Sequence, residues 1–445
     1  MDTTVPVTVR ALAAGGSGVA DLPDGRVVFV PRTVPGDLAH IRIERSKRRW
    51  ALGSVERIVE AGPDRRRAPC PLYDVCGGCQ LQHLPYERQL EWKGRFVQDA
   101  LQRIGGLAAA EPPPVVRSPR ETGYRNRMTF TLRRLGGGRI VAGLHALGRP
   151  GHIVDVRDEC LLPSPPLMEV WGALRRAWGG GARHLPAGPR LRLTLREAEP
   201  DTMEGAAVRP REGTGRESAG GQAGPPRAVE LVVEGGAAGW TRAAAALGAR
   251  VPGLVRIWHR AEGAHGEPAL VWGEEPEAGA PAFVQVNAAA AALLEEHVVR
   301  AAGSGASAVD AYGGAGRHGH ALARRGWRVT AIERVPAACA AARRGAPSGW
   351  RVLEGTVEAR LPEALPADLL VLNPPRAGLT PDVVAIVAAR GPARVVYVSC
   401  DPATLARDVA LLAPRYEAAG VRCFDLFPQT AHVETVLVLE ARREP

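Results

Sequence analysis

The sequence predicts an α/β protein in which a small β-barrel and a mostly β central part precede a C-terminal domain built on a parallel sheet. Short β-branched runs separated by Gly, Asp-Gly and Pro-Gly-Asp turns fill residues 1–60, which is typical of a five-stranded barrel of the OB kind. Residues 113–275 read mostly as strands and loops. From residue 276 onward, strand-like runs alternate with Ala- and Arg-rich helical segments, and this alternation indicates βαβ units.

Length and charge narrow the classes of function. A chain of 445 residues with 45% hydrophobic residues can form several cores. The formal net charge of +10 favours a polyanionic partner such as RNA or DNA, although a solvated Arg-rich surface would give the same charge. Because the sequence has neither a secretory signal nor an apolar run of about 18 residues, we expect a cytoplasmic protein with no membrane partner.

The first 228 residues contain four further signals. Asp24-Gly25 predicts a hairpin turn inside the barrel. The basic run RIERSKRRW, which ends at Trp50, suits phosphate contact with base stacking, or else an edge strand protected by charge. Within 61–112, the segment YERQLEWKGRFVQDALQR predicts an amphipathic helix that ends at two glycines. The Gly-, Arg- and Glu-rich insert at 200–228 lacks core residues, so we expect a mobile loop.

The first strand of the parallel sheet leads into a candidate nucleotide site. In SAVDAYGGAGRHGHALA, a buried strand with Asp310 runs into a Gly-rich turn and a helix, an arrangement that brings backbone N–H groups close to a ligand. The next strand ends at Glu333, which suits a ribose diol. Because the turn lacks the GxGxxG spacing of dinucleotide sites, it favours a donor without a pyrophosphate, such as S-adenosylmethionine.

Two later strand ends carry further candidates. The fourth strand ends in Asn373-Pro-Pro-Arg376, a stiff loop. The fifth ends at Cys400, just before a helix whose N-terminus is expected to lower the pKa of the thiol. A core role is the usual one for a single cysteine, and we assign it to Cys339 and Cys423. Glu434, considered alone, reads as a surface strand residue.

The remaining four of the seven cysteines suggest a metal centre. An odd number of cysteines in a chain without a signal argues against a disulfide framework. Cys70, Cys76 and Cys79 are clustered and Cys160 follows far downstream. Four thiols suit Zn²⁺ or an iron–sulfur cluster, and three clustered with one remote favour [4Fe–4S]. A redox pair at Cys76 and Cys79 is the weaker alternative.

Together these motifs resemble the RNA uracil-C5 methyltransferases that carry a TRAM domain and a [4Fe–4S] cluster and make 5-methyluridine in ribosomal RNA. The resemblance covers nearly the whole chain. It is carried by the motifs VFVPRTVPGDLAHIRI, CPLYDVCGGCQLQHL, DECLLP, GYRNRMTF, FVQVN, DAYGGAG, NPPRAGL, SCDPATLARD and FPQTAHVE. It implies a Rossmann-like class I methyltransferase domain at 276–445, a TRAM barrel at 1–60, an iron–sulfur segment with its helix at 61–112 and a central β-rich domain at 113–275.

The resemblance also implies roles for individual residues. Cys400 would be the nucleophile at uracil C6, and Glu434 the acceptor of the C5 proton. The matched contacts to S-adenosylmethionine are Gln285, Tyr312, Glu333, Asn373, Arg317 and Thr356. The matched cluster ligands are Cys70, Cys76, Cys79 and Cys160. The expected protein is a monomer that methylates a uridine of 23S rRNA, either after flipping the base out of its stack or within a single-stranded target.

The sequence departs from the family pattern at three positions. Asn373 stands where the family usually has Asp, Arg317 where it often has Asn, and Gly313 where it has Cys. The change at Asn373 removes a negative charge beside the sulfonium donor. These departures leave three alternatives open: an RNA-binding assembly factor with impaired catalysis, methylation of an exocyclic amine through the NPP loop, and methylation of tRNA in place of ribosomal RNA.

Overall fold

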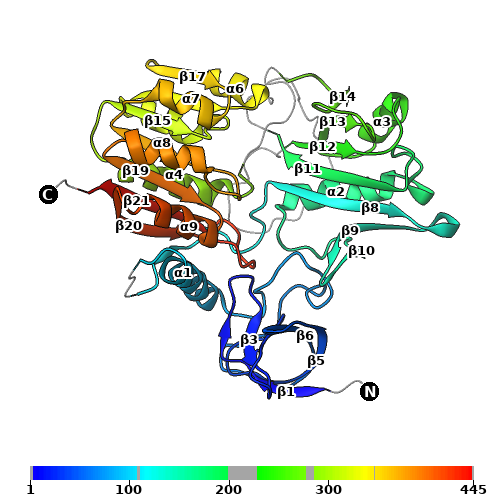
Figure 1. Ribbon diagram of the computed structural model, residues 1–445. Coiled ribbons are helices and arrows are strands. Elements are labelled where there is room, and N and C mark those ends of the chain that lie inside the picture. The colour runs from blue at the N-terminus through cyan, green and yellow to red at the C-terminus, as the bar shows by residue number, and fades with distance from the viewer. Residues whose placement is uncertain (1–3, 108–110, 199–227, 277–284, 345, 443–445) are drawn as a thin grey trace, which may run out of the picture. The chain divides into compact units, whose positions relative to one another are not determined.

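The structure is a computed structural model that describes residues 4–107, 111–198, 228–276, 285–344 and 346–442. It divides into two compact units, one of residues 1–69, 79–121 and 282–445 and the other of residues 70–78 and 122–281 (Figure 1). Apart from Ala228, the insert predicted at 200–228 lies outside the described residues. In the part of the chain that the structure describes, every helix is too short or too polar to cross a membrane.

The N-terminal segment of the first unit forms a closed β-barrel. Its six-stranded sheet has the order β1-β5-β6-β4-β3-β2. The first extended stretch divides into two strands that occupy opposite edges of this sheet, which closes the barrel and raises the expected five strands to six. The hairpin at Asp24-Gly25 joins β3 to β4, with Gly25 at a φ of 81°. The strands are β1 (Val5–Thr8), β2 (Ala11–Leu12), β3 (Gly18–Asp21), β4 (Val27–Val30), β5 (Leu38–Ser46) and β6 (Trp50–Glu60).

The C-terminal segment of the same unit contains the predicted parallel sheet. Its eight strands have the order β17-β16-β15-β18-β19-β21-β20-β7, and the first five are mutually parallel. The chain leaves β15 toward β16 on one side and later returns to β18 on the other, so the topological switch point lies between β15 and β18. The strands are β7 (Val115–Val116), β15 (Ser307–Ala311), β16 (Arg328–Glu333), β17 (Trp350–Glu354), β18 (Leu369–Leu372), β19 (Arg394–Ser399), β20 (Tyr416–Phe424) and β21 (Glu434–Ala441).

Helices cover both faces of this sheet, which explains the continuous apolar run of the central strand. In β18, Leu370 and Leu372 belong to the core on one face, and Leu369 and Val371 to the core on the other. Helices α1, α7, α8 and α9 contribute to the first core, and α4 and α5 to the second. The helices are α1 (Tyr86–Arg103), α4 (Ala288–Ala301), α5 (Arg317–Ala323), α6 (Pro336–Arg343), α7 (Val357–Ala364), α8 (Pro381–Arg390) and α9 (Pro402–Leu412).

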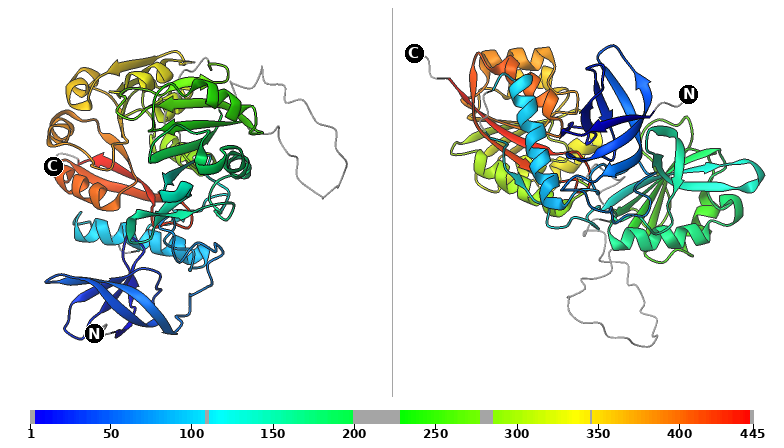
Figure 2. Two further views of the ribbon diagram at one scale, coloured as in Figure 1. Left: turned by 90° about the vertical axis from the view of Figure 1, so that its right-hand side faces the viewer. Right: turned by 90° about the horizontal axis from the view of Figure 1, so that it is seen from below.

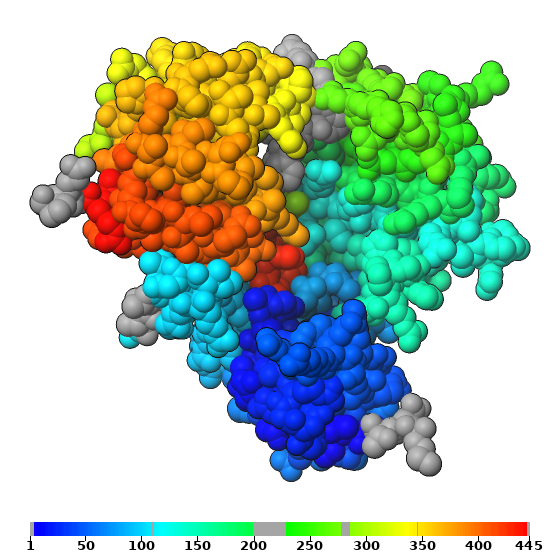
Figure 3. All heavy atoms as spheres, in the orientation of Figure 1, coloured from blue at the N-terminus to red at the C-terminus, as the bar shows by residue number. Residues whose placement is uncertain are grey.

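The predicted helix of the cysteine segment is α1, and it is part of the first unit. It packs against α9 and β7, and the turned views of Figure 2 show it beside the C-terminal strands. A small core joins the barrel, the segment before α1 and the C-terminal segment: it contains Leu12, Leu81, Phe96 and Ala431. In Figure 3 the barrel and the C-terminal segment accordingly meet at the surface.

The second unit is a seven-stranded sheet of order β10-β9-β8-β11-β12-β13-β14, in which only β12 and β13 pair in parallel. Trp171 of α2 stacks on Phe130 of β8 with ring centroids 4.0 Å apart, at the centre of its core. Its strands are β8 (Arg127–Arg134), β9 (Ile140–Ala146), β10 (Arg149–Asp155), β11 (Arg190–Glu197), β12 (Val229–Glu234), β13 (Leu254–Arg260) and β14 (Ala269–Trp272). Its helices are α2 (Pro165–Ala177), α3 (Thr241–Gly248) and the short turns η1 (Gly136–Gly138) and η2 (Gly180–Ala182).

Candidate active site

Cys400 and Glu434 lie next to each other at the end of two paired strands. β19 and β21 are antiparallel, and Ser399 pairs with Thr435. Cys400 follows β19 directly and Glu434 is the first residue of β21, so the pairing register places the thiol and the carboxyl group at the same edge of the sheet. Glu434 is buried and Cys400 is half-buried. Proximity of a nucleophile and a carboxylate is the arrangement that acid–base chemistry on a bound ring requires.

Burial changes the pKa values of both groups. Desolvation raises the pKa of Glu434 to about 7, against an opposing effect of the Arg376 charge. Such a carboxyl group can gain or lose a proton near neutral pH. Desolvation and the Glu434 charge also raise the pKa of Cys400. The predicted lowering of this pKa by the helix N-terminus is therefore wrong, because burial and the neighbouring carboxylate outweigh the helix.

Arg376 is the third member of this group. It belongs to the NPPR motif, which predicts a stiff loop but no role for the arginine. Its side chain hydrogen-bonds to Cys400, which lowers the pKa of the thiol. Its charge also acts on Glu434. Arginine keeps its proton at all relevant pH values, so Arg376 is a fixed positive charge that favours the ionised forms of both neighbours.

Helix α9 holds the loop that carries Arg376. The Thr404 hydroxyl donates to the carbonyl of Arg376 at 3.1 Å, and Asp408 accepts from the backbone N–H of Leu379 at 2.8 Å. Between them Gly378 has a φ of 79°, and a Cβ there would collide with Thr404 and Asp408. The glycine thus allows the loop to lie against α9. At the start of α9, Asp401 caps the helix by accepting from Thr404 N–H at 2.9 Å.

The Gly-rich turn after β15 is closed by Glu333. One oxygen of the Glu333 carboxylate accepts from Gly314 N–H at 3.0 Å, and the other accepts from Val335 N–H at 2.8 Å. Asp310 is fully buried. Its Oδ2 accepts from Gly319 N–H at 2.9 Å, whereas Oδ1 has no hydrogen-bond partner among the described residues. Desolvation raises the pKa of Asp310 to about 7.

Tyr312 completes the polar lining of this turn. It adopts a φ of 61°, which is unusual for a residue other than glycine. Its buried hydroxyl finds no hydrogen-bond partner within the described ranges. Desolvation and the charges of Glu358 and Asp408 raise its pKa to about 12. Buried polar atoms without partners are uncommon in folded proteins, so Tyr312 and Asp310 together fit a site that is satisfied by a polar ligand.

Several residues singled out in the sequence therefore end neighbouring strands at one edge of the sheet. Tyr312, Glu333, Asn373 and Cys400 end or directly follow β15, β16, β18 and β19. Thr356 follows β17 and precedes α7, and its side chain hydrogen-bonds to Glu358.

Arg317 and Gln285 are placed differently. The Arg317 guanidinium lies 3.3 Å from the Glu295 carboxylate of α4, so an ion pair engages it. Gln285 precedes α4 and is half-buried.

A buried ion pair supports the loop before Glu434. Lys93 of α1 lies 2.6 Å from Asp425 and donates to the carbonyl of Phe427 at 3.1 Å. Gln89 of α1 exchanges hydrogen bonds with Gln429, donating from Nε2 and accepting from the backbone N–H, both at 3.0 Å. These contacts join residues more than 300 positions apart, and no local sequence pattern could indicate them.

The cysteines of the proposed metal centre are divided between the two units. Cys70, Cys76 and Cys160 belong to the second unit and Cys79 to the first. In the second unit, the Cys70 thiol donates to the carbonyl of Glu159 at 3.7 Å, and Glu159 directly precedes Cys160. The backbone of Cys76 pairs with that of Ala146 in an isolated antiparallel β-bridge. Among the described residues, no three His, Cys, Asp or Glu side chains form a group that could hold a metal ion.

The basic run of the barrel spans the turn between β5 and β6. The Arg45 guanidinium lies 6.0 Å from the ring centroid of Trp50, and the Phe29 and Trp50 rings pack edge-on with their centroids 6.4 Å apart. The structure therefore places an aromatic ring beside a cation on the barrel, which is compatible with both interpretations of this run.

The fold and the site define a class. A parallel sheet with a Gly-rich turn after its first strand and an acidic residue at the end of its second is typical of α/β enzymes that bind a nucleotide-type ligand at this edge. The thiol beside a carboxyl group at the same edge is compatible with nucleophilic catalysis.

The comparisons with known proteins define the family within that class. A model described as TRAM domain matches residues 3–55, and a model described as tRNA (Uracil-5-)-methyltransferase matches residues 362–442. An uncharacterized RNA methyltransferase from Gloeobacter violaceus is 36% identical, covering 98% of this chain and 96% of the relative. Another from Nitratidesulfovibrio vulgaris is 35% identical over the same shares of the two chains.

A solved structure is similar over the same length. The Pyrococcus abyssi tRNA (uracil-54, C5)-methyltransferase in complex with S-adenosyl-L-homocysteine is 25% identical, with a TM-score of 0.68, and the match covers 98% of this chain and 100% of that one. This chain belongs to the RNA (uracil-5-)-methyltransferase family and carries a TRAM domain at its N-terminus.

Proposed function

We propose that this protein transfers a methyl group from S-adenosylmethionine to C5 of a uridine in RNA, with Cys400 as nucleophile and Glu434 as proton acceptor. The observation that carries the proposal is the antiparallel pairing of Ser399 with Thr435, which supports a reaction centre formed by Cys400, directly after Ser399, and Glu434, directly before Thr435. Family membership supports the donor and the RNA substrate.

The first step activates the ring. C5 of uracil is a weak nucleophile, and a covalent bond to C6 makes it a stronger one. The Cys400 thiolate attacks C6, and the electron pair of the C5–C6 double bond moves toward C5 and the adjoining carbonyl. Because the pKa of Cys400 is raised in the unliganded protein, the thiol must first lose its proton. The Arg376 hydrogen bond favours that loss.

The second and third steps complete the substitution. C5 forms a bond to the methyl group supplied by S-adenosylmethionine, whose sulfur departs with the electron pair of the broken bond. Glu434 then removes the proton from C5. The electrons of that C–H bond form the double bond again and expel the Cys400 thiolate. A carboxyl group with a pKa of about 7 suits this proton transfer at neutral pH.

The residues around the Gly-rich turn fit the donor. The hydroxyl of Tyr312 and Oδ1 of Asp310 are buried without protein partners among the described residues, so a ligand could satisfy them. Asn373, Gln285, Thr356 and Glu333 are proposed as further contacts. Arg317 is the weakest candidate because Glu295 already engages it.

Ribosomal RNA is the proposed target on the motif resemblance, with tRNA as the alternative that the family description and the Pyrococcus abyssi enzyme favour. The test incubates purified protein and labelled donor with ribosomal RNA and with tRNA from cells that lack the protein's gene, followed by nucleoside mass spectrometry. 5-Methyluridine in one RNA class identifies the target. Its absence from both, with donor binding intact, would refute the proposal. A methyl group on an exocyclic nitrogen would identify amine chemistry in its place.

An RNA-binding protein with impaired catalysis is the second candidate, and Asn373 is the observation that favours it. The Asn side chain is uncharged where the family usually has a carboxylate near the sulfonium. Calorimetry with S-adenosylmethionine separates the candidates, since a protein that binds RNA and has no donor affinity would be an assembly factor. An Asn373→Asp variant that gains affinity would show that this position limits donor binding.

A [4Fe–4S] cluster on Cys70, Cys76, Cys79 and Cys160 is proposed from the cysteine spacing and the resemblance. In the described ranges, no three His, Cys, Asp or Glu side chains form a group that could hold a metal ion, and the reaction proposed above involves no cluster. Protein prepared without oxygen should contain iron and acid-labile sulfide and absorb in the visible range. A colourless protein that contains zinc would overturn this proposal without affecting the methyl transfer.

A further inference from the structure

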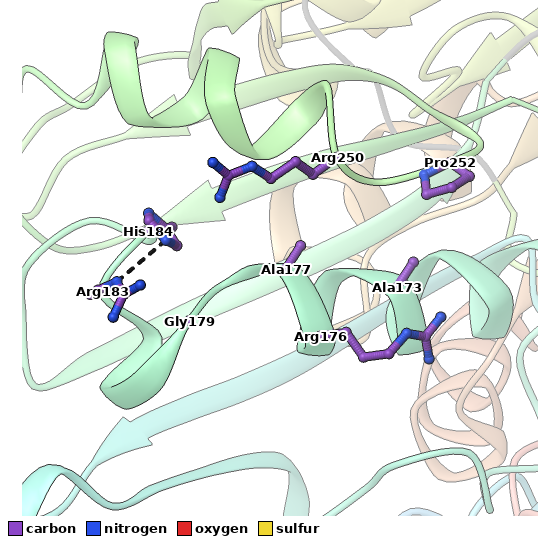
Figure 4. Close-up of a pocket in the computed structure, with 8 residues that line it drawn as sticks. All are labelled: Ala173, Arg176, Ala177, Gly179, Arg183, His184, Arg250 and Pro252. Atoms are coloured by element: carbon purple, nitrogen blue, oxygen red, sulfur yellow. Dashed lines mark hydrogen bonds between the residues drawn. The ribbon is translucent and has the colours of Figure 1, made fainter.

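The second unit contains a basic pocket that the proposed reaction does not use. It is formed by the end of α2, the turn that follows it and the loop after α3, and its cavity volume is about 510 Å³. Its lining residues are Ala173, Arg176, Ala177, Gly179, Arg183, His184, Arg250 and Pro252. None of these described lining residues carries a carboxylate. Figure 4 shows the Arg250 side chain extending toward Arg183 and His184, whereas Arg176 projects from α2 in another direction.

The Arg183–His184 segment is held rigidly. Arg134 donates to the carbonyl of Ala182 at 2.8 Å and to that of Gly181 at 3.0 Å. The indole N–H of Trp240 donates to the carbonyl of His184 at 2.9 Å. These bonds fix the backbone on both sides of Arg183, so the backbone loses little conformational entropy when the side chain meets a ligand.

The turn before this segment is shaped around the same side chains. Gly179 has a φ of 74°, and a Cβ there would lie 2.9 Å from the His184 ring and 3.2 Å from Arg183. The Arg183 Nε–H donates to His184 Nε2 at 3.4 Å. This bond requires the neutral imidazole with its proton on Nδ1, so the ring retains a donor for a second partner.

The arginines of this pocket differ from the structural arginines of the same unit. Arg175 forms an ion pair with Asp155 at 2.9 Å, and Arg256 forms one with Glu230 at 2.8 Å. By contrast, the guanidinium groups of Arg176 and Arg250 make no hydrogen bond or ion pair with any residue in the described ranges, and the hydrogen bond of the Arg183 guanidinium within these ranges goes to the His184 ring.

Capping of helix ends does not explain these arginines. The pocket lies at the C-termini of α2 and α3, where carbonyl groups attract cations. However, none of the three guanidinium groups donates to a carbonyl of the described chain. Arg183 and Arg250 have no acidic partner among the described residues, so these two cationic groups repel each other and gain most from an anion that accepts several hydrogen bonds at once.

We propose that this pocket binds a phosphate group of the RNA backbone, with Arg183 and Arg250 as its principal contacts and His184 as a further donor. The inference rests on RNA as the proposed substrate. Phosphate contacts position an RNA without reading its sequence, so this site would anchor the substrate while the sheet edge of the first unit reads the uridine. A free phosphate or pyrophosphate has the same chemistry, and the experiment separates the two sources.

The test compares two double variants of the full-length chain with equal loss of charge. Arg183→Ala with Arg250→Ala removes the pocket contacts. Arg325→Ala with Arg390→Ala removes two exposed arginines that also follow or end helices, α5 and α8. Binding of a fluorescein-labelled RNA stem-loop is measured as a function of salt concentration without donor, and thermal melting establishes that both variants fold. The pocket variant should reduce the slope of log K against log[salt] by about 1 and weaken binding roughly tenfold. The control should lie near wild type.

The other outcomes decide against the proposal. Equal salt slopes in the two variants would overturn it, because the pocket would then contribute only net charge. Calorimetric binding of inorganic pyrophosphate that is lost in the pocket variant, with the RNA slope unchanged, would overturn the RNA assignment and identify a site for a free anion. Methylation is assayed separately: 5-methyluridine formation with an unchanged slope refutes the pocket alone, and a changed slope without 5-methyluridine refutes the proposed reaction alone.

Discussion

Lys93 Nζ lies 2.6 Å from Asp425 Oδ1, and both side chains are completely buried. Desolvation lowers the pKa of Lys93, and the Asp425 carboxylate opposes that shift. The pair joins α1, the helix that follows Cys79, to the loop that ends at Glu434. The position of Glu434, the proton acceptor of the proposed reaction, is therefore supported by a contact from α1.

The first prediction concerns this pair. Lys93→Met leaves the Asp425 carboxylate buried without its cation, which should lower the free energy of unfolding by about 3 to 5 kcal/mol. Combining Lys93→Met with Asp425→Leu should restore most of it, since an apolar pair of similar volume requires no desolvation of charge. Urea denaturation measures both. If the double variant is no more stable than the single one, the ion pair is not the source of the effect.

The second prediction uses Glu434. Its pKa is raised from 4.5 to about 7, so the folded protein holds a proton there that the unfolded chain has lost. Its contribution to stability is therefore greatest below pH 4.5 and is lost as the pH rises through 7. Glu434→Gln should make the protein more stable at pH 8 by about 1 to 3 kcal/mol, and by little at pH 4.5. Thermal unfolding at the two pH values checks the sign.

The same variant separates the chemical steps. Glutamine cannot accept the C5 proton, so Glu434→Gln should accumulate a covalent RNA–protein complex that carries the transferred methyl group, with turnover reduced by about 100-fold or more. Denaturing gels with labelled donor detect the complex. Cys400→Ala should bind RNA and form no complex. A complex formed by that variant would exclude Cys400 as the nucleophile.

The strand ends could be predicted from the sequence, because the positions of Glu333, Asn373 and Cys400 follow from apolar runs and the turns that end them. The βαβ pattern also predicts that these ends share one edge. The direction of the pKa shift of Cys400 could not be predicted, because it depends on the burial of the thiol and on the charge of Glu434. Glu434 is 34 positions away in the sequence and begins the strand that pairs with β19. The ion pair of Lys93 with Asp425 could not be predicted either. In the sequence around each of them, the residue indicates only a polar position in an amphipathic segment.

The cysteine segment shows a different limit. The short spacing between Cys76 and Cys79 predicts that they belong to the same site. In the structure, however, the chain passes from one compact unit to the other after Gly78. A boundary between units depends on which side chains bury against which core, and two glycines in succession carry no information on that point.

The third prediction concerns Tyr312. Its buried hydroxyl makes no hydrogen bond to a described residue, so Tyr312→Phe removes a group that is desolvated without compensation. The unliganded variant should be as stable as wild type or more stable by about 1 kcal/mol. Its affinity for S-adenosylhomocysteine should fall roughly tenfold if the ligand satisfies this hydroxyl. Calorimetry measures the affinity, and unchanged binding would remove Tyr312 from the donor site.

The last prediction concerns Arg376, whose guanidinium hydrogen-bonds to Cys400 and lowers the pKa of the thiol. The Arg376 charge lowers the pKa of both Cys400 and Glu434. Arg376→Ala removes that charge, so both pKa values should rise further. The thiolate fraction at pH 8 then falls, and alkylation of Cys400 by iodoacetamide, followed by mass spectrometry of its peptide, should slow. Arg376→Lys keeps the charge without the planar fork and should restore part of the rate. Arg390→Ala, which removes an exposed arginine at the end of α8, is the control and should leave the rate unchanged. A slowed reaction in that control, or an unaltered one in Arg376→Ala, would mean that the charge beside the thiol does not set its ionisation.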